Sequence, residues 1–351
     1  MSETTLYRKY RPQNFNEVLG QDHIVKVLES SIKLENIAHA YIFSGSRGTG
    51  KTSIARIFAK EIGTTPNDIT EIDAASNTGV DDIRALNESV NTLPFESKYK
   101  VYILDEAHML SKSAWNALLK TLEEPPRHVI FIMATTEYNK IPETIVSRCQ
   151  TFVFKKPTQK VLKDVILSIA KKENFKIEPS SAELIALLGD GSFRDAESIL
   201  QKVMSASKDN KISPEEVELV TGAPKAEVVN DFIKAIDEGD LELGLGAVSK
   251  ATDLNIDMLL YFRLVLHKMR SILLLRNLKS AEGKLKEELS DSDFNFLKGI
   301  ADKKTSNPPI CRAGINSDTL LTLLNYYDMV TKAYIPELPL ELVLIKLIDR
   351  N

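Results

Sequence analysis

Cysteine is scarce in this chain, which has only Cys149 and Cys311 among its 351 residues. Two thiols are too few for a disulfide framework or for a zinc site built from four cysteines. Long apolar runs are also missing: no window approaches the roughly 18 residues that a membrane span needs, and the first twelve residues hold no apolar segment typical of a secretory signal. We therefore expect a protein of the reducing cytoplasm that has no membrane partner.

An excess of positive charge is absent as well. The formal net charge is −4, so no global basic field attracts nucleic acid, and any contact with DNA must come from a local patch. A composition of 43% hydrophobic and 27% charged residues is that of a soluble globular protein with ample core. The length predicts two or three domains.

The strongest chemical signal is the glycine-rich segment GSRGTGKT at 45–52, between the apolar run Tyr41–Phe43 and an amphipathic helix expected over Ser53–Ile62. This strand–loop–helix context is that of a P-loop, although the bare spacing also occurs by chance. Glycines let backbone N–H groups converge on phosphate oxygens, and the helix adds the positive end of its dipole. We expect Lys51 near the β- and γ-phosphates and the Thr52 hydroxyl on Mg²⁺. The predicted phosphate-binding residues are Gly45, Ser46, Arg47, Gly48, Thr49, Gly50, Lys51 and Thr52.

An acidic pair, Asp105 and Glu106, closes the apolar run Tyr99–Leu104 about 50 residues after the P-loop. Two acids at the end of a strand are more often a solvated turn. After a P-loop, however, they place a carboxylate beside the metal of the nucleotide. We expect Asp105 to hold Mg²⁺, directly or through water, and Glu106 to polarise the attacking water, which favours hydrolysis over simple binding.

Further apolar runs alternate with helical patterns up to residue 156. Strands are expected over Ile69–Ile72, Val129–Ala134 and Gln150–Phe154, and helices over Gln21–Leu34 and Val80–Asn91. This alternation predicts an α/β fold with a parallel, doubly wound sheet whose ligands lie at the carboxyl ends of the strands. Thr136 then falls on the nucleotide side, where it could touch the γ-phosphate or orient water. Taken alone, it would be a turn threonine.

Strand signals stop after Pro157, and nearly everything that follows is helical. From about Val220 the pattern contains no catalytic motif, and its apolar stripes are core faces or surfaces for subunit assembly. We predict domains at 1–156, 157–220 and 221–351. The expected helices are Gln159–Glu173, Ser180–Gly189, Asp195–Ser205, Lys225–Glu238, Asp240–Thr252, Ile256–Leu278, Asp318–Ala333 and Leu338–Ile348.

Two arginines and one N-terminal segment are ambiguous from the sequence alone. Arg148, after a short helix at Pro142–Val146, is ordinarily a surface ion pair. Arg194 stands in a first helical turn, where the dipole favours an acid, so it either reaches a phosphate or pairs with Glu197. The segment Leu6–Gly20 is either an arm packed on the core or, through Tyr10, Pro12 and Leu19, an apolar wall for a purine base.

One family accounts for these features together. The carrying motifs are Tyr7–Pro12, GSRGTGKT at 45–52, EIDAASNTGVDDIR at 71–84, LDEAHML at 104–110, LLKTLEEPP at 118–126, ATTE at 134–137 and SRCQ at 147–150. This set resembles the bacterial DNA polymerase III gamma/tau subunits, the ATPases of the sliding-clamp loader. The resemblance runs almost continuously through residues 6–205 and more weakly to the end.

The resemblance implies an AAA+ P-loop NTPase domain with a parallel sheet, followed by a small helical lid domain and an all-α collar domain. It implies that Lys51 and Thr52 grip ATP·Mg²⁺ and that Asp105 and Glu106 are the Walker B pair. Thr136 matches the sensor 1 position and Arg194 the sensor 2 position. The adenine pocket is matched by Tyr10, Arg11, Pro12 and Leu19.

Arg148 matches the arginine finger, which acts on ATP bound by the neighbouring subunit. A guanidinium that meets the charge developing on the γ-phosphate can raise the rate by roughly 10³–10⁵. The implied partners are delta and delta-prime type subunits, further copies of this chain in a ring, the sliding clamp and primer–template DNA. Thr78, Arg84 and Lys120 match positions that touch the DNA backbone, a contact that follows duplex shape without reading sequence.

The sequence departs from the family between the P-loop helix and the EIDAAS strand. The family usually carries a four-cysteine zinc module there, whereas only Gly63–Asp68 joins the two elements here. No zinc is therefore expected, and no phosphate ligand is lost with the module. We also expect the polymerase- and helicase-binding extensions of a tau form to lie outside a chain that ends at Asn351.

Two other functions are weighed against this one. A different AAA+ motor, such as a replication factor C small subunit or a branch-migration helicase, is disfavoured by the EIDAASNTGVDDIR segment. A delta-prime-like scaffold that does not hydrolyse ATP is disfavoured by the intact Lys51, Thr52, Asp105 and Glu106.

Overall fold

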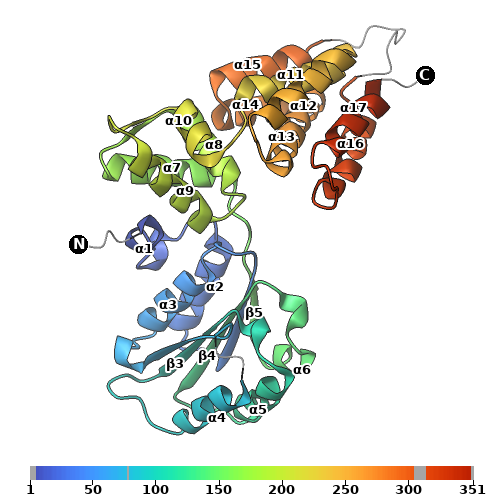
Figure 1. Ribbon diagram of the computed structural model, residues 1–351. Helices are drawn as coiled ribbons and strands as arrows, with labels where there is room; N and C mark the ends of the chain where they lie inside the picture. Colours follow the sequence, from blue (N-terminus) through green and yellow to red (C-terminus); the bar gives the residue numbers. More distant parts are fainter. Residues whose placement is uncertain (1–4, 77–78, 304–313, 349–351) are drawn as a thin grey trace. The chain divides into compact units, whose positions relative to one another are not determined.

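The computed structural model of the chain describes residues 5–76, 79–303 and 314–348. The chain forms two compact units. The sheet unit comprises residues 1–165 and 186–198, and the helical unit comprises residues 166–185 and 199–351. Figure 1 traces both along the sequence. The division into three domains at 156 and 220 stays a prediction.

Five parallel strands form the sheet of the first unit. Their order is β2-β3-β4-β1-β5, so β1 lies between β4 and β5, and β3 pairs with β4. The predicted α/β fold is thereby confirmed. The strands are β1 (Ala40–Ser44), β2 (Ile69–Asp73), β3 (Lys100–Asp105), β4 (Val129–Thr135) and β5 (Gln150–Val153).

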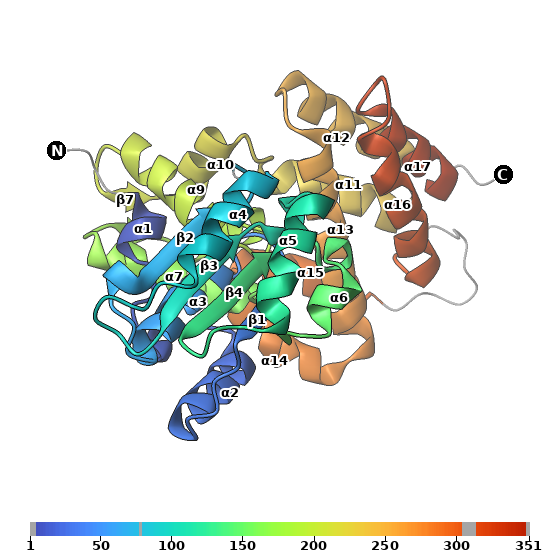
Figure 2. The ribbon, with the colours of Figure 1, turned by 90° about the horizontal axis from the view of Figure 1, so that it is seen from below.

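Helices cover both faces of this sheet. Because side chains alternate along a strand, Tyr41 and Phe43 pack into a core with α2 (Asp22–Lys33) and α3 (Lys51–Glu61). Ala40 and Ile42 face the opposite core, which contains α4, α5 and α6. Figure 2 shows α4 and α5 together over the strands. The covering helices of this face are α4 (Val80–Ser89), α5 (Lys112–Glu123) and α6 (Glu143–Val146).

Local sequence explains where these helices begin and end. The Ser111 hydroxyl accepts a hydrogen bond from the Ala114 N–H and caps α5, which ends before Pro125. The P-loop helix α3 begins at Lys51, two residues earlier than predicted, because Gly50 adopts the left-handed conformation that closes the loop. Short helical turns complete the unit: α1 (Leu6–Lys9), η1 (Phe15–Glu17), η2 (Pro66–Asp68), η3 (Ala107–Met109) and η4 (Tyr138–Lys140).

The short connection between α3 and β2 is fastened by Asp68, whose side chain is buried. Its carboxylate accepts hydrogen bonds from the backbone N–H groups of Phe95, Glu96 and Ser97. Burial alone would raise the pKa of Asp68, but these donors outweigh it and hold the pKa well below its usual range. The connection between α3 and β2 is thus tied to the loop that precedes β3.

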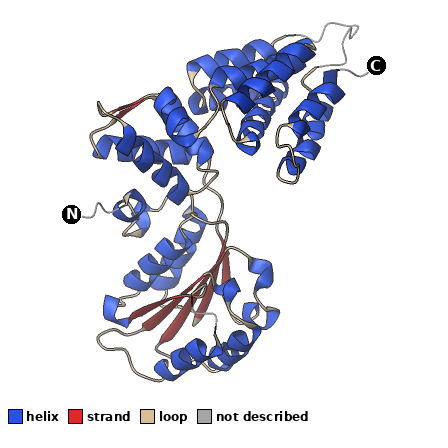
Figure 3. Cartoon of the chain, in the orientation of Figure 1, coloured by secondary structure: helices blue, strands red, loops and turns tan. Residues whose placement is uncertain are grey.

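The second unit is predominantly helical, but one expectation there was wrong. We predicted no strand after residue 157, whereas β6 (Lys176–Ile177) and β7 (Lys211–Ile212) form a parallel ladder. Each strand has two residues, too few to show the alternation by which strands are recognised. Figure 3 shows the larger sheet and this ladder in red among the helices.

The helices of this part of the chain pack both with neighbours in sequence and with more distant helices. Helices α11 and α12 form a pair, α13 contacts α15 and α16, and α17 contacts α12 and α16. Three of the helices, α10, α14 and α15, were not predicted. Within the described residues, no helix is long and apolar enough to cross a membrane. The helices are α7 (Gln159–Lys172), α8 (Pro179–Leu188), α9 (Phe193–Ala206), α10 (Pro214–Thr221), α11 (Ala226–Glu238), α12 (Leu241–Asp253), α13 (Met258–Asn277), α14 (Lys279–Glu288), α15 (Asp291–Ala301), α16 (Ser317–Val330) and α17 (Leu338–Ile348).

Candidate nucleotide site

Three neighbouring strands deliver the predicted site residues to one edge of the sheet. The P-loop follows β1, Asp105 and Glu106 stand at the end of β3, and Thr136 follows β4. In the order β3-β4-β1 these carboxyl ends are adjacent. In open α/β sheets the ligand binds beyond the carboxyl ends of the strands. The three motifs therefore form one site although up to 90 residues separate them in the sequence.

The P-loop requires glycine at position 48 for two reasons. Gly48 has a positive φ of 73°, and an added Cβ would lie 1.9 Å from the Ser192 Oγ. The Phe193 N–H also donates to the Gly48 carbonyl at 3.0 Å. The loop is thus in contact with the start of α9, which carries Arg194.

Lys51 is the buried cation of the loop, with only 6% of its surface exposed. Its Nζ donates to the carbonyls of Gly45 at 2.8 Å and Ser46 at 2.9 Å. Burial lowers the pKa of Lys51, and the nearby carboxylates of Glu106 and Asp105 raise it without cancelling that effect. A polyanion at this point would offset the burial and favour the ammonium form.

Thr52 and Asp105 offer two oxygen ligands for a divalent cation, and their side chains are in contact. The Thr52 hydroxyl donates to Asp105 Oδ2 at 2.9 Å. A hydroxyl and a carboxylate are hard oxygen ligands, and Mg²⁺ commonly takes one or two protein ligands while waters and phosphates complete its shell. The pair predicted from the sequence therefore fits magnesium.

Glu106 has an unusual backbone conformation at the end of β3. It lies in the left-handed region with φ 48°, which is uncommon for residues other than glycine. Its N–H donates to Asp105 Oδ1, and its carbonyl accepts from the Met109 N–H in the turn η3. Its Oε2 accepts a hydrogen bond from the Thr136 hydroxyl at 3.1 Å. Glu106, which is predicted to polarise the attacking water, is thus in contact with Thr136, which is predicted to touch the γ-phosphate or orient water.

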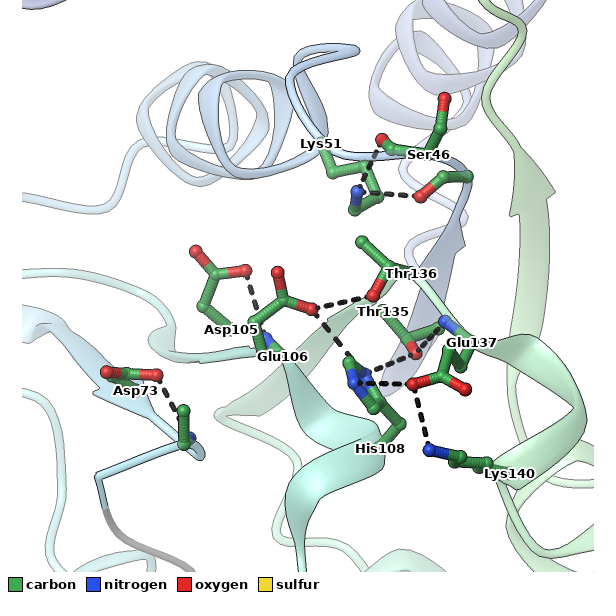
Figure 4. Close-up of polar contacts among 12 residues, drawn as sticks. Ser46, Lys51, Asp73, Asp105, Glu106, His108, Thr135, Thr136, Glu137 and Lys140 are labelled. Atoms are coloured by element: carbon green, nitrogen blue, oxygen red, sulfur yellow. Dashed lines mark hydrogen bonds and ion pairs between the residues drawn. The ribbon is translucent and has the colours of Figure 1, made fainter. Parts of the chain in front are cut away.

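A histidine that we had given no role joins this group. Figure 4 shows His108 between Glu106 and Glu137. Its Nδ1 lies 3.1 Å from the Thr135 Oγ and 3.5 Å from Glu106 Oε2, and its Nε2 lies 3.3 Å from Glu137 Oε1. The sequence DEAH places a histidine two residues after the glutamate. That spacing alone does not predict a contact between the two side chains, because the contact depends on the conformation of the turn.

Arg194 reaches toward the N-terminal arm. Its guanidinium lies over the Tyr7 ring, 4.9 Å from the centroid, which is cation–π geometry. Within the described residues it makes no ion pair with Glu197, the alternative partner considered above. Glu197 is 8% exposed, and burial raises its pKa to about 7.

The segment matched to the adenine pocket is accessible and tied to the P-loop. Tyr10, Arg11 and Pro12 are half-buried, and Leu19 is exposed. Two residues after Leu19, the buried Gln21 side chain donates to the Lys155 carbonyl at 2.7 Å and the Thr49 carbonyl at 3.5 Å. Gln21 is a second residue whose contribution we did not predict.

The contacts of Arg148 lie away from the P-loop residues. Its guanidinium pairs with Glu123 at 2.8 Å and donates to the Thr144 carbonyl at 2.8 Å. The side chains of Arg148 and Glu123 are 35% and 46% exposed. The ordinary interpretation, a surface ion pair, thus describes Arg148 within a single chain.

Two of the three residues matched to DNA contacts are on adjacent helices. Arg84 on α4 is exposed and pairs with Asp81, and Lys120 on α5 is exposed. The helices are linked because the Asn87 amide donates to the Ala117 carbonyl. Thr78 lies outside the described residues.

This arrangement, a parallel sheet with a glycine-rich loop after β1 and an acidic pair at the end of β3, is that of a P-loop nucleotide-binding fold. Solved structures of RuvB from Thermotoga maritima share the fold. The Holliday junction branch migration motor superposes with a TM-score of 0.52 at 20% identity, covering 83% of this chain and 92% of that one. A mutant of the same protein has a TM-score of 0.53 at 24% identity, covering 64% and 79%.

In sequence, the chain is similar to DNA polymerase III gamma/tau subunits, so the resemblance predicted from the motifs is confirmed. It is 41% identical over 318 residues to the tau subunit of Bacillus subtilis, covering 85% of this chain and 56% of that protein. Identity to the gamma/tau subunit of Mycoplasma genitalium is 46%, covering 67% and 43%, and to the Escherichia coli tau subunit 39%, covering 73% and 43%. Residues 63–158 match the family described as DNA polymerase III, delta subunit. The chain spans about half the length of the curated relatives it matches.

Proposed function

We propose that this chain is the ATP-hydrolysing subunit of a DNA polymerase III clamp loader. It would use ATP binding and hydrolysis to open the sliding clamp and load it onto primer–template DNA during replication. The observation that carries the proposal is the meeting of Lys51, the Thr52–Asp105 pair and Glu106 at one edge of the sheet. A protein that only bound ATP would not need a glutamate held at this edge of the sheet.

The phosphates of ATP are bound by the P-loop in this proposal. Backbone N–H groups of residues 45–52 and the start of α3 point at the phosphate oxygens. Lys51 exchanges its two backbone acceptors for β- and γ-phosphate oxygens. Mg²⁺, held by Thr52 and Asp105, would draw negative charge from the phosphates. Arg194 acts from the start of α9, which touches the loop at Gly48.

The base of the nucleotide is assigned to the segment before α2. Tyr10, Pro12 and Leu19 offer partly exposed apolar surface, and Arg11 stands among them. The hydrogen bonds of Gln21 hold this segment to the P-loop and to Lys155. Adenine and phosphates would therefore be bound by connected parts of the sheet unit.

Glu106 is the group that activates the attacking water. A carboxylate within hydrogen-bond reach of a water can accept its proton as the oxygen attacks the γ-phosphorus. The Thr136 hydroxyl is bonded to Oε2 of Glu106, so it constrains how the carboxylate faces the site. In-line attack depends on this orientation, because phosphoryl transfer relies on positioning and charge stabilisation.

Arg148 completes the reaction in a neighbouring subunit. Its pairing with Glu123 is partly exposed, and exposed pairs contribute only about 0–1 kcal/mol. A triphosphate presented by a neighbour can therefore displace Glu123. The ring would contain copies of this chain together with delta and delta-prime type subunits, and would act on the sliding clamp and on DNA. Arg84 and Lys120 are the described residues assigned to the DNA backbone.

A scaffold without ATPase activity is the second candidate, and the match of residues 63–158 to the delta subunit family favours it. Such a protein would have no use for a buried Lys51 or for a bonded Thr52–Asp105 pair. We therefore give hydrolysis precedence.

The test is ATP turnover by the full chain mixed with delta and delta-prime type subunits, sliding clamp and primed DNA. Lys51→Ala should lose nucleotide binding. Arg148→Ala should keep the ATP dissociation constant within about twofold and lose stimulated turnover by roughly 10³-fold or more. Nucleotide binding is measured separately with a fluorescent ATP analogue.

Matched controls separate function from general damage. Lys60→Ala removes an exposed lysine from the same helix as Lys51. Arg56→Ala removes a partly exposed arginine–glutamate pair of the same kind as Arg148–Glu123. Both controls should turn over ATP at the wild-type rate. A Lys51→Ala protein that still supports clamp loading would establish the scaffold and refute the ATPase.

A further inference from the structure

We propose that His108 is a positioning residue that fixes the carboxylate of Glu106 for attack on ATP. This inference rests on the proposed ATPase function and adds a residue to it. The imidazole stands between two carboxylates, Glu106 on the nucleotide side and Glu137 on the other, and both of its nitrogens have partners.

The Nδ1 edge of the ring faces the reaction site. Nδ1 lies 3.1 Å from the Thr135 Oγ and 3.5 Å from Glu106 Oε2. Thr136 donates to this same Oε2, at 3.1 Å. Two groups thus converge on one oxygen of Glu106. Among the described residues, Oε1 has no hydrogen-bond partner, which leaves it to orient a water.

The Nε2 edge anchors the ring from behind. Nε2 lies 3.3 Å from Glu137 Oε1, and the same oxygen accepts from Lys140 Nζ at 2.9 Å. The Glu137 N–H donates to the Thr135 Oγ at 3.0 Å. Because Thr135 is fully buried at the end of β4, its hydroxyl ties both the histidine and Glu137 to the sheet.

These contacts define one orientation of the ring. Hydrogen on Nδ1 lets the ring donate toward the Thr135 oxygen and Glu106 Oε2, and hydrogen on Nε2 lets it donate to the Glu137 carboxylate. A ring that carries both protons donates on both sides. In either form the imidazole has the same place, since its side chain is only 7% exposed and its partners lie on two sides.

Glu106 needs such support more than an ordinary glutamate does. Its backbone is left-handed, and its side chain is 34% exposed, so neither the chain nor close packing fixes the carboxylate. It is nevertheless close enough to Lys51 to raise the pKa of that lysine. Figure 4 shows the carboxylate between Lys51 and His108. Without the imidazole, Thr136 would be its remaining side-chain contact among the described residues.

The experiment compares substitutions at two histidines. His108→Ala removes both contacts, whereas His108→Asn puts an amide where Nδ1 stands. The control is His128→Ala. His128 forms a hydrogen bond with the Val90 carbonyl. It is far from the P-loop in sequence and is not one of the residues that contact Glu106 or Glu137. Each protein is assayed as the full chain with partner subunits, clamp and primed DNA, for kcat, KM, dissociation constant of a fluorescent ATP analogue, and Tm.

We expect His108→Ala to lower kcat by about 10- to 100-fold, less than the loss of the base itself, which is typically 10²–10⁴-fold. The dissociation constant should stay within about twofold, because His108 does not face the phosphates. The kcat of His108→Asn should be at least about tenfold higher than that of His108→Ala. His128→Ala should leave kcat unchanged whatever its effect on Tm.

Other results would overturn the assignment. A kcat for His108→Ala within twofold of wild type would show that Glu106 is positioned without the imidazole. Equal losses in His108→Ala and His128→Ala, or an asparagine no better than alanine, would indicate a purely structural role. If His108→Ala does not fold, Glu137→Gln decides the matter, because it weakens the anchor on Nε2 and an unchanged kcat would refute the assignment. Absence of turnover in the wild-type assembly would instead refute the ATPase function itself.

Discussion

Glu197 is a carboxyl group that the fold encloses, and it has no ion-pair partner in the described part of the chain. It is 8% exposed, and burial raises its pKa to about 7 from an ordinary value of 4.5. A group whose pKa is higher in the folded state binds its proton more tightly there. Its contribution to stability is therefore fully present below about pH 4.5 and is lost as the pH rises through about 7.

Replacing Glu197 by glutamine should remove this dependence. The free energy of unfolding of Glu197→Gln, relative to wild type, should rise by up to about 3 kcal/mol between pH 5 and pH 8. Urea denaturation at several pH values measures it. Glu197→Asp keeps a titratable carboxyl and serves as the control, whose pH dependence should resemble that of wild type. A constant difference between Glu197→Gln and wild type across this range would contradict the assignment.

At the scale of elements, α4 and α5 form one surface on one side of the sheet. They pack together and share the core that contains Ala40 and Ile42. Arg84 and Lys120 lie exposed on them, and the partner of Arg84 is an exposed aspartate at a spacing of three residues. Such a pair is weak, so the guanidinium can move to a phosphate at little cost.

Arg84→Ala and Lys120→Ala should each weaken DNA binding to the same extent on every sequence. Each should also reduce the slope of log K against log salt by about 0.9, the value for one phosphate contact on duplex DNA. Fluorescence anisotropy of the assembled loader across a salt series gives both quantities. Lys60→Ala, on the helix α3 that covers the opposite face, is the control. Unchanged slopes in both variants would remove these helices from the DNA surface.

Sequence reasoning identified the elements whose patterns are long. The apolar strands and the P-loop were found because each spans several residues with a fixed order, and Asp105 and Glu106 were found because they end such a strand. His108 was missed because its contact depends on the left-handed turn at Glu106, a conformation that a glutamate rarely adopts. The pairing of Arg148 with Glu123 joins residues 25 apart, one in the turn after α6 and one at the end of α5, and no local pattern encodes that.

At the scale of the whole molecule, the proposed finger does not contact the proposed nucleotide site of its own chain. Arg148 pairs with Glu123 and donates to the Thr144 carbonyl, and among the described residues it makes no hydrogen bond or ion pair with the P-loop. We expect the isolated chain to hydrolyse ATP slowly for this reason. The turnover rate at each nucleotide site then depends on whether the neighbouring subunit supplies an arginine.

Mixing two inactive variants tests this directly. Lys51→Ala chains keep the finger but not the P-loop, and Arg148→Ala chains keep the P-loop but not the finger. Where they become neighbours, one intact site forms, so the mixture should recover a substantial fraction of wild-type turnover while each variant alone stays inactive. Steady-state phosphate release in assembled rings is the measurement. A mixture no faster than its components would mean that Arg148 acts on its own chain.

The bonds of Lys51 to the carbonyls of Gly45 and Ser46 also set a threshold for what the loop admits. Binding of an anion to the Lys51 ammonium breaks both of these hydrogen bonds, so the anion must replace them before it gains any net affinity. A chain of three phosphates reaches the lysine and the helix start at once, so it offers more in exchange than chloride or a single inorganic phosphate does. We therefore expect the loop to favour polyphosphates over the abundant small anions around it.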